Sequence, residues 1–283
     1  NDRDIYKERI NLGKRVFKKV IKAVQADLSN TVFSYVPNTA EVSYYGLIQE
    51  CHNYLNKIKI EYLLKEPNFQ SQEFKNLFNL KVRSEKIAIK DAKLRTFISA
   101  DEGREDLVTH IYDTTYGIVK KNDTLVIIDD SIVRGTTLRQ SILRILDRLE
   151  PKKIIIVSSA PQIRYPDCYG IDMAKLGDFI AFQAAIKLIK EANKDNFINE
   201  IYERCKKENE KKDNIKNCVK EIYKPFSAEQ ISNKISELLK PKGITAEVEI
   251  IYQSIEDLHS SCPEHTGDSV SYTHLTLPTN VAV

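Results

Sequence analysis

The sequence TLVIIDDSIVRGTT spans residues 124–137, and this stretch decides the fold. Its first five residues are an apolar run that predicts a short buried strand, and residues 129–135 after it are polar and turn-like. Thr136 or Thr137 can cap a helix that runs to Glu150. That helix is supported by apolar residues that recur on one face, namely Leu138, Ile142, Ile145 and Leu149. The stretch therefore predicts a strand, a loop and a helix in succession.

A second apolar strand follows that helix. Residues 153–159 read KIIIVSS, which is rich in β-branched side chains and apolar on both faces. A strand of this kind belongs in the middle of a parallel sheet, and the order strand, helix, strand forms a right-handed βαβ unit. Upstream, residues 5–26 predict a helix and residues 31–36 (TVFSYV) another strand. We therefore predict an α/β fold with a central parallel sheet and helices on both of its sides.

The rest of the chain indicates additions to this core. A second helix is predicted after Pro37, and residues 58–64 form a short apolar stretch that indicates a strand. In residues 65–116 the apolar residues show no regular spacing. We therefore expect a long excursion there that acts as a lid. We assign residues 1–177 to the core, and residues 178–265 to a helical C-terminal extension with a late strand and helix.

Two local signals refine the C-terminal part. Ser227 with Gln230 forms a capping-box signature at the start of a helix, and residues 245–252 alternate in a way that predicts the late strand. Residues 270–283 (VSYTHLTLPTNVAV) differ from the preceding composition. We predict that they are a non-native tail and leave them out of the fold.

Composition and charge exclude several classes of protein. The 283 residues are 42% hydrophobic and 29% charged, which is ordinary for a globular protein that buries a sizeable core. The net charge of +3 is too small to indicate a nucleic-acid partner. No run approaches the roughly 18 apolar residues of a membrane span, and the polar first residues do not form a signal peptide. The five cysteines are widely spaced without a CxxC pair, so we expect a cytoplasmic protein with no membrane partner.

The glycine–threonine end of the loop suits a phosphate group. It follows the carboxyl end of a predicted parallel strand, where open α/β sheets bind ligands. The helix after it presents unpaired N–H groups and a partial positive charge. Gly135 allows the backbone to approach a phosphate closely, and hydroxyl donors come from Ser131, Thr136 and Thr137.

The two carboxylates at the other end of the loop need a different partner. Asp129 and Asp130 are acceptors, so they suit hydroxyl groups or a cation. A ribose offers two adjacent hydroxyls, and Mg²⁺ binds through one or two carboxylates together with substrate phosphates. A pair of acids after a strand is also found in phosphoryl-transfer sites that hold Mg²⁺. Together with the phosphate cradle, however, the pair favours a sugar phosphate.

The loop resembles the diphosphate-sugar motif of type I phosphoribosyltransferases, and its SIVRGTT portion is similar to that of the amidophosphoribosyltransferase family. Three other stretches resemble the same family. Residues 160–173 match the segment after its next strand, residues 94–98 (LRTFI) the end of its flexible loop, and residues 4–13 the start of its transferase domain. The resemblance is strongest between residues 124 and 177.

The resemblance implies a fold of the type I phosphoribosyltransferase kind and one half of a coupled reaction. In this family a glutaminase domain releases ammonia from glutamine. The transferase domain uses the ammonia to displace diphosphate from 5-phosphoribosyl diphosphate, which gives 5-phosphoribosylamine in the first step of de novo purine synthesis. No glutaminase region precedes residue 1, so we expect a fragment whose ammonia comes from a glutaminase domain outside this chain. The family also implies a homo-oligomer.

The same resemblance implies roles for individual residues. Asp129 and Asp130 would hold the ribose hydroxyls and help to place Mg²⁺. The 5-phosphate would be held by Ser131, Arg134, Gly135, Thr136 and Thr137. Arg95, in the stretch that resembles the flexible lid, would serve in catalysis by reaching the diphosphate, and the alternative is an ordinary surface arginine.

Three features depart from the family pattern. Ala40 stands where a metal-linked serine is common, so Thr39 would serve instead. The family has a lysine in its lid, and the sequence does not show which of Lys86, Lys90 and Lys93 corresponds to it. Some family members bind an iron–sulfur cluster, but Cys168 is one position off that pattern and the clustered C-terminal cysteines are missing. We therefore predict Mg²⁺ and no cluster.

Two alternative functions stay open. One is a phosphoribosyltransferase that joins the sugar to a purine or pyrimidine base, which would need a base pocket. The other is a regulator that binds phosphoribosyl diphosphate without turning it over, which Ala40 and the missing glutaminase half keep open. Ammonia-dependent turnover separates the leading hypothesis from both.

Overall fold

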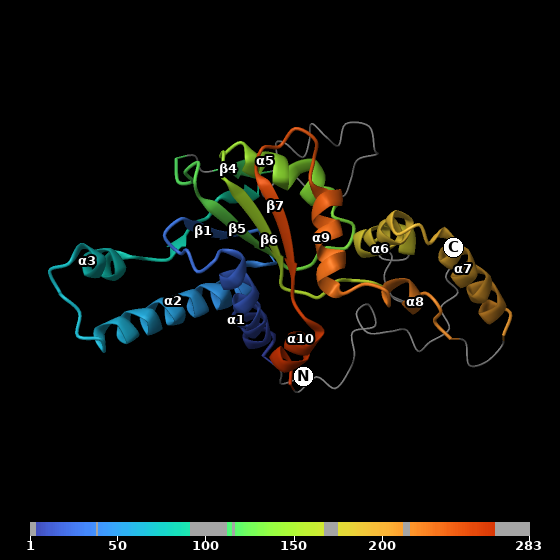
Figure 1. Ribbon diagram of the computed structural model, residues 1–283, viewed down its shortest axis with the longest axis horizontal. Helices are drawn as coiled ribbons and strands as arrows, with labels where there is room; N and C mark the ends of the chain where they lie inside the picture. Colours follow the sequence, from blue (N-terminus) through green and yellow to red (C-terminus); the bar gives the residue numbers. More distant parts are fainter. Residues whose placement is uncertain are drawn as a thin grey trace.

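A five-stranded parallel sheet forms the centre of the molecule (Figure 1). The structure is a computed structural model, and it describes residues 4–37, 39–90, 112–114, 117–166, 175–211 and 216–263. All neighbouring strands of the sheet are parallel. In spatial order they are β2 (Arg83–Ser84), β1 (Thr31–Tyr35), β5 (Thr124–Asp129), β6 (Lys153–Ser158) and β7 (Glu247–Tyr252). The predicted α/β fold with a central parallel sheet is confirmed.

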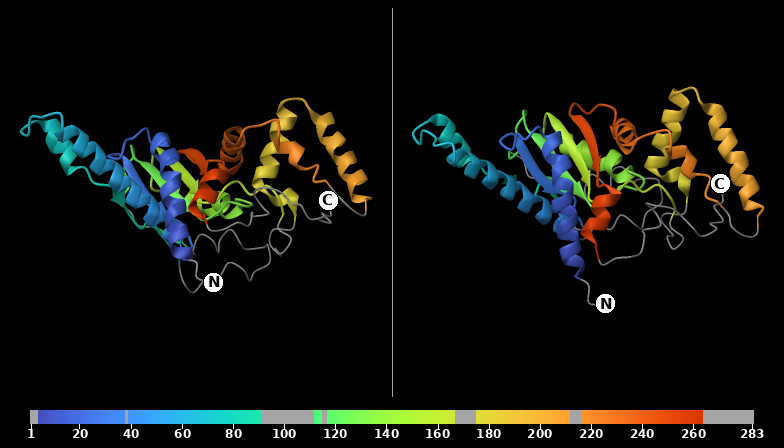
Figure 2. Two further views of the ribbon diagram at one scale, coloured as in Figure 1. Left: turned by 90° about the horizontal axis from the view of Figure 1, so that it is seen from below. Right: turned by 60° about the horizontal axis from the view of Figure 1, so that its bottom comes forward.

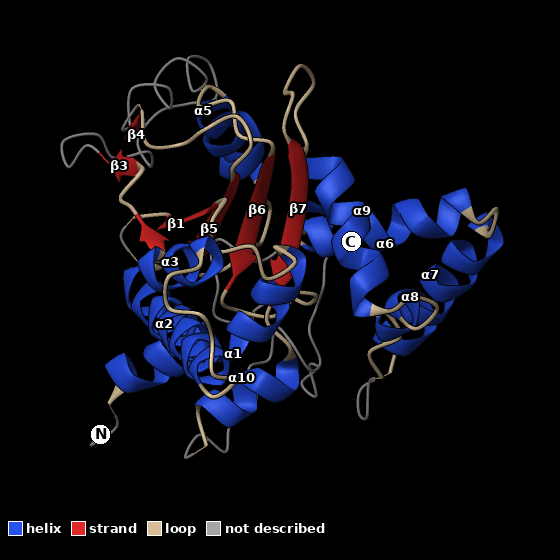
Figure 3. Cartoon of the chain, turned by 60° about the vertical axis from the view of Figure 1, so that its left-hand side comes forward, coloured by secondary structure: helices blue, strands red, loops and turns tan. Residues whose placement is uncertain are grey.

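Helices cover both faces of this sheet, as Figure 3 shows. Alternate residues of each strand point to opposite faces, so Val126 and Ile128 pack toward α1 (Ile5–Ala23) and α2 (Glu41–Leu63). Leu125 and Ile127 pack on the other face, which is covered by α5 (Leu143–Asp147), α6 (Ile180–Glu191) and α9 (Ala228–Leu239). Apolar residues on both faces bury the middle strands completely, which explains why β5 and β6 carry continuous apolar runs.

Helices α1 and α2 cross at very short range because each places a glycine at the crossing. A Cβ added at Gly13 would lie 1.8 Å from the carbonyl oxygen of Ser43, and a Cβ at Gly46 would lie 2.0 Å from that of Ile10. Any side chain at these two positions would force the helices apart. The crossing therefore holds the α1–α2 layer against β1 and β5, the strands that lead into the polar loops.

One prediction about the segment after β1 is wrong. Residues 58–64 do not form a strand, because α2 continues through them to Leu63. Its distal end is joined to α3 (Gln72–Asn79) by the Lys59 ammonium, which donates to the Phe78 and Leu80 carbonyl oxygens at 3.1 and 3.0 Å. In Figures 1 and 2 this α2–α3 arm points away from the sheet.

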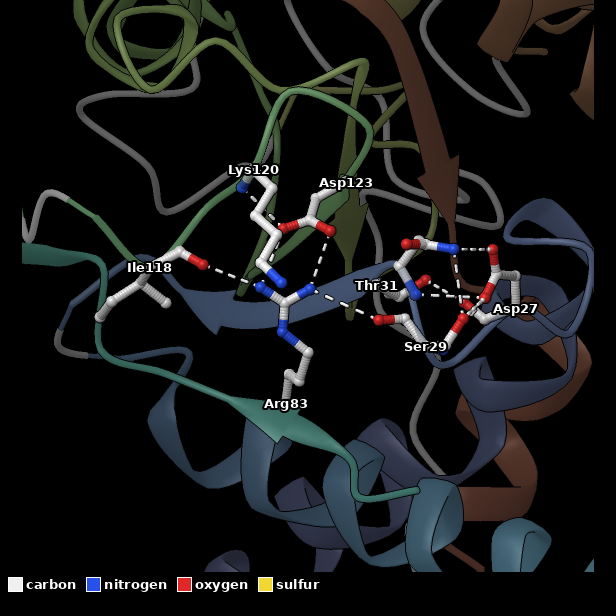
Figure 4. Close-up of polar contacts among 8 residues, drawn as sticks. Asp27, Ser29, Thr31, Arg83, Ile118, Lys120 and Asp123 are labelled. Atoms are coloured by element: carbon white, nitrogen blue, oxygen red, sulfur yellow. Dashed lines mark hydrogen bonds and ion pairs between the residues drawn. The ribbon is translucent and has the colours of Figure 1, made fainter. Parts of the chain in front are cut away.

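The predicted excursion over residues 65–116 contains more order than its sequence indicates. Besides α3, it supplies the edge strand β2 and an antiparallel pair, β3 (Ala88–Lys90) with β4 (Tyr112–Thr114). Arg83 of β2 joins this segment to the turn before β5, where its guanidinium contacts both carboxylate oxygens of Asp123 at 2.8 Å (Figure 4). Residues 91–111 lie outside the described part, so the lid itself stays a prediction.

The C-terminal part contributes to the sheet as well as adding helices. After η2 (Leu176–Asp178) and α6 come α7 (Asp195–Asn209), α8 (Lys220–Tyr223) and α9, and the predicted capping box of Ser227 and Gln230 is confirmed at the start of α9. β7 then pairs with β6 and is followed by α10 (Ile255–Ser261), which packs against α1. The division at residue 177 stays a prediction, although the sheet draws its last strand from beyond it.

The helix after the polar loop differs from the prediction in detail. It ends at Asp147 rather than Glu150, and its turns over Leu138–Ile142 are π-helical. The Thr137 side chain makes no capping hydrogen bond. Its hydroxyl therefore stays available for a ligand. Within the described residues, no helix is both long and apolar enough to cross a bilayer.

Candidate functional site

The predicted loop lies at the carboxyl edge of the sheet. Asp129 is the last residue of β5, and residues 130–137 lead from that strand into the helix before α5. β1, β6 and β7 end at the same edge because all four strands are parallel. Asp129 is partly buried, whereas Asp130, Thr136 and Thr137 are exposed. The structure thus brings the two carboxylates and the two threonines to one accessible edge, as the sequence predicted.

Hydrogen bonds from β6 and α6 hold the loop in place. The Ser159 N–H donates to the Asp129 carbonyl oxygen at 2.9 Å, and the Ser159 hydroxyl donates to the Asp130 carbonyl oxygen at 3.2 Å. Further along, the Ile180 N–H at the start of α6 donates to the Val133 carbonyl oxygen at 2.9 Å. Ile132 points into the core and is 3% exposed. The loop is therefore fixed before any ligand arrives, which lowers the entropic cost of binding.

Gly135 cannot be replaced without a change in its surroundings. Its φ is +68°, a left-handed conformation that side chains disfavour. A Cβ at this position would also lie 2.5 Å from Cδ2 of Leu239, a buried residue at the end of α9. The glycine therefore allows α9 to pack directly under the loop, which the sequence motif alone does not reveal.

The two neighbouring carboxylates differ in their environment. The Asp130 N–H donates to Oδ1 of Asp129 at 2.8 Å, and the Ser131 N–H donates to Oδ1 of Asp130 at 2.7 Å. Burial, followed by the nearby charge of Asp130, raises the pKa of Asp129 to about 8. Among the described residues no cation pairs with Asp129. A bound cation, or hydroxyl donors from a sugar, would favour its charged form.

The donor set at this edge fits Mg²⁺. Two adjacent carboxylates are the protein ligands that this ion uses when substrate phosphates complete its coordination. Within the described residues no cluster of three metal-binding side chains forms, so the remaining ligands would come from the substrate and water. The raised pKa of Asp129 is the expected property of a carboxylate pair that has no cation between its members.

Arg134 lies at the outer side of the loop. Its Nε is 3.6 Å from Oδ2 of Asp178, and both side chains are about half exposed. An exposed pair of this kind contributes little to stability. Because the pair is open to solvent, contact between Arg134 and a phosphate stays a prediction.

The loop after β1 lies at the same edge of the sheet. Thr39 is exposed, and Ala40 is fully buried at the start of α2 without a side-chain cap. The next residue, Glu41, accepts hydrogen bonds from the Tyr35 and Tyr45 hydroxyls, each at 2.8 Å. These two bonds, that of Tyr45 first, lower the pKa of Glu41. This third carboxylate was not predicted from the sequence, where its only signal is a tyrosine four residues later and another at the strand end.

Tyr252 and Ser158 are also absent from the sequence-based site. In the strand register Ser158 lies opposite Asp129, and Tyr252 lies opposite Ser158. Only the order of strands in the sheet reveals this row.

Several predicted residues fall outside the described part of the chain. Arg95, Lys93 and Cys168 are among them, and so are all residues of the stretch 167–173. Lys86 is described and exposed, and its charge contributes to the lowered pKa of Glu41. The lid lysine stays unassigned among Lys86, Lys90 and Lys93, and the absence of an iron–sulfur cluster stays a prediction.

A cavity of about 690 Å³ lies between α1, α9 and β7, and Tyr252 is among its lining residues. It is bordered also by Lys19, Arg164 and Gln253, and by none of the predicted site residues. The loop, rather than this cavity, combines carboxylates, hydroxyls and the N–H groups of a helix start.

Comparison with known proteins gives matches to amidophosphoribosyltransferases. No family model matches the chain. Amidophosphoribosyltransferase of Haemophilus influenzae is 44% identical over 71 residues, which cover 25% of this chain and 14% of that protein. Amidophosphoribosyltransferase of Lachancea kluyveri is 28% identical over 178 residues, or 63% of this chain and 29% of that protein. The resemblance expected from the motifs is confirmed.

Solved structures agree on the fold. Glutamine phosphoribosylpyrophosphate amidotransferase from B. subtilis, complexed with ADP and GMP, matches 95% of this chain and 40% of its own with a TM-score of 0.51 and 18% identity. A structure described as the allosteric regulatory enzyme of purine biosynthesis matches 95% of this chain and 41% of its own with a TM-score of 0.51 and 19% identity. The chain thus spans well under half the length of these relatives.

Proposed function

We propose that this chain is the phosphoribosyl-transfer half of an amidophosphoribosyltransferase. It would use ammonia to displace diphosphate from 5-phosphoribosyl diphosphate and give 5-phosphoribosylamine, the first step of de novo purine synthesis. The single observation that carries the proposal is the loop of residues 129–137 at the carboxyl end of β5, with a carboxylate pair at one end and a glycine–threonine helix start at the other. The matches to amidophosphoribosyltransferases support it.

The loop divides the substrate between its two ends. Asp129 and Asp130 accept hydrogen bonds from the ribose hydroxyls, and the helix start receives the 5-phosphate. Gly135 brings backbone N–H groups close to the phosphate oxygens, and Ser131, Thr136 and Thr137 add hydroxyl donors. In this proposal the two ends of the loop together hold the sugar with its first carbon facing the incoming ammonia.

Mg²⁺, held by Asp129 and Asp130 together with Thr39 from the loop after β1, would neutralise charge on the leaving diphosphate. Departure of diphosphate builds positive charge on the sugar, so the chain contributes by positioning, by stabilising charge and by excluding water. In this proposal Arg95 reaches the diphosphate from the lid, and closure of the lid removes water from the site.

The remaining parts of the proposal rest on the resemblance. Ammonia would come from a glutaminase domain outside this chain, and copies of the protein would assemble into a homo-oligomer. A cytoplasmic location fits the four described cysteines, Cys51, Cys205, Cys218 and Cys262, which are free thiols.

A second candidate is a regulator that binds phosphoribosyl diphosphate without turning it over. It is favoured by Ala40, which is fully buried and offers no hydroxyl at a position where one would help to hold the metal and diphosphate. Both candidates require binding, and only the enzyme requires turnover.

The test is diphosphate release from phosphoribosyl diphosphate in Mg²⁺, with ammonium and glutamine compared as nitrogen sources. Turnover with ammonium alone is the result expected for a transferase half. Tight binding without turnover on either nitrogen source would replace the enzyme with the regulator. Absence of binding as well would contradict both candidates.

A further inference from the structure

Three polar residues form a row across the carboxyl ends of neighbouring strands. The register pairs Asp129 of β5 with Ser158 of β6, and Ser158 with Tyr252 of β7. Residues opposite one another in neighbouring strands point to the same face of a sheet. Tyr252 packs in the core on the α5–α9 side, so Asp129 also faces that side. A tyrosine and a carboxylate thus share one face with a serine between them.

Within the described residues, the Tyr252 hydroxyl makes no hydrogen bond. The residue is 5% exposed and its hydroxyl is buried. Among the described side chains, the only other buried polar atom without a hydrogen-bond partner is Oε1 of Gln253. The neighbouring Ser158 hydroxyl is engaged, since it donates to the Ala160 carbonyl oxygen at 2.8 Å. Burial of an unpaired hydroxyl is unfavourable, and a phenylalanine would fill the same space without that penalty.

The Asp129 carboxylate, in turn, is an acceptor that can take a further hydrogen bond. It accepts a hydrogen bond from the Asp130 N–H, and its nearest side-chain partner is another carboxyl group, that of Asp130. The two groups also lie within electrostatic reach of each other, because the charge of Asp129, after the larger effect of burial, raises the pKa of Tyr252. Tyr252 therefore keeps its proton and remains a donor, and the nearby group that can use it is Asp129.

We propose that Tyr252 is a positioning residue for Asp129, and that its hydroxyl donates a hydrogen bond to the Asp129 carboxylate when phosphoribosyl diphosphate and Mg²⁺ occupy the loop. The inference rests on the proposed function, because the sugar and the cation are what require an oriented carboxylate. Carboxylates that bind a metal are held from the protein side by hydrogen bonds of this kind. Tyr252 itself touches neither the substrate nor the metal.

The test replaces the hydroxyl and keeps the ring. In Tyr252→Phe of the full chain, the Kd for phosphoribosyl diphosphate in Mg²⁺, measured by titration calorimetry, is expected to rise roughly tenfold. The stability of the free protein should stay unchanged or increase. Tyr223→Phe is the matched control, because Tyr223 is 3% exposed in the same core and its hydroxyl donates to the Arg164 carbonyl oxygen at 2.8 Å. That control should lower stability and leave the Kd unchanged.

A spectroscopic measurement isolates the hydroxyl. The chain has 14 tyrosines and no tryptophan, so the near-ultraviolet difference spectrum on binding is dominated by tyrosine. Phosphoribosyl diphosphate with Mg²⁺ should shift a tyrosine band in the wild type and in Tyr223→Phe. The shift should be absent from Tyr252→Phe.

The outcomes separate the inference from the function on which it rests. An equal Kd and the same difference spectrum in the wild type and Tyr252→Phe would overturn the role of Tyr252 and leave the proposed function standing. Lower stability of Tyr252→Phe with an unchanged Kd would also overturn it, since the hydroxyl would then be structural. A wild type that does not bind phosphoribosyl diphosphate in Mg²⁺ would overturn the proposed function and the inference together.

Discussion

Strand β5 begins directly after Asp123 and ends on Asp129, and these two carboxylates lie in opposite surroundings. Asp123 is fully buried and pairs with both terminal nitrogens of Arg83 at 2.8 Å, while the Lys120 N–H donates to it at 2.7 Å (Figure 4). Burial alone would raise the pKa of Asp123. The hydrogen bonds from Arg83 and Lys120, with the charge of Arg83, outweigh it, so the pKa is lowered.

At the other end of the strand, burial outweighs the hydrogen bonds, so the pKa of the carboxylate is raised instead of lowered. Asp129 lies next to a second carboxylate and has no cation among the described residues, and its pKa is raised to about 8 by burial and by Asp130. The amino end of β5 is therefore satisfied and structural, whereas its carboxyl end remains unfavourable in a way that a ligand can relieve. Perturbed carboxylates of this kind gather at functional sites.

The largest expected effect comes from removing the carboxylates at the binding end. Asp129→Asn combined with Asp130→Asn should lower kcat/KM for phosphoribosyl diphosphate by roughly 10²–10³, because the site loses its sugar and Mg²⁺ ligands. Stability should not fall, since the variant no longer has a buried carboxyl group whose ionisation next to Asp130 is unfavourable. Diphosphate release with ammonium and urea unfolding measure the two effects. Activity within about tenfold of the wild type would remove the loop from the active site.

At Asp123, before the amino end of β5, we expect the opposite result, a loss of stability with little change in binding. Asp123→Asn leaves the Arg83 charge in a largely buried position, so the free energy of unfolding should fall by about 3 kcal/mol. The Kd for phosphoribosyl diphosphate should stay close to that of the wild type at a temperature where the variant is folded. Urea unfolding and calorimetric binding provide the two readouts. Weakened binding with unchanged stability would contradict the contrast between the two ends of β5.

Gly135→Ala probes the packing of α9 at the binding end. A Cβ there meets Leu239 at 2.5 Å and occupies a left-handed backbone conformation, so we expect a loss of about 2 kcal/mol of stability together with weaker substrate binding. The loss should be smaller in a Leu239→Ala background, by about 1 kcal/mol, because the clash is then relieved. Urea unfolding of the four proteins in this cycle measures the coupling. Additive losses would show that the backbone conformation alone is responsible.

The two aspartates should give opposite pH dependences of stability. The folded pKa of Asp129, about 8, lies above the unfolded value of about 4, so its contribution is complete below about pH 4 and is lost as pH rises through about 8. Between about pH 6 and 7 the free energy of unfolding should fall by about 1 kcal/mol, and Asp129→Asn should abolish this decline. Asp123 has a lowered pKa, so its contribution is present above about pH 4 and is lost on acidification. Urea unfolding across this range checks both signs, and a wild type without the neutral decline would contradict the raised pKa of Asp129.

The smallest effect is expected where an arginine–carboxylate pair is exposed. Arg204 contacts both carboxylate oxygens of Glu221, at 3.1 and 2.6 Å, with a geometry like that of Arg83 and Asp123. Because it lies in solvent, Arg204→Gln should leave the urea midpoint essentially unchanged. A large loss would show that two-point geometry, rather than burial, makes the Arg83–Asp123 pair strong.

Sequence patterns predicted the parts of this molecule that are locally encoded. The apolar runs before Asp129 and before Ser159 are long enough and β-branched enough to be strands, and the structure contains both. The polar stretch between them predicted the loop at the carboxyl edge, and the match to solved structures confirms the fold. The assigned roles of the loop residues stay predictions.

Sequence patterns gave wrong or incomplete predictions where contacts between distant segments determine the structure. Residues 58–64 have the composition of a short strand, but they continue α2, whose distal end is joined to α3 through Lys59. Glu41 and Tyr252 carry no motif of their own. They come to the carboxyl edge of the sheet because β1 and β7 end there alongside β5.

The sequence alone was enough to predict strands β1, β5, β6 and β7 and the polar loop after β5, because hydrophobic runs and turn residues act over short stretches of chain. It did not indicate the edge strand β2, and it wrongly indicated a strand at residues 58–64. It did not show that Asp123, at the other end of the same strand, pairs with an arginine whereas Asp129 does not. Only the tertiary structure brought Arg83 to Asp123, and among the described residues it gives Asp129 no cation as a partner. The charge of a buried carboxylate depends on desolvation and on partners supplied by distant segments, and the order of the strands decides which partners arrive.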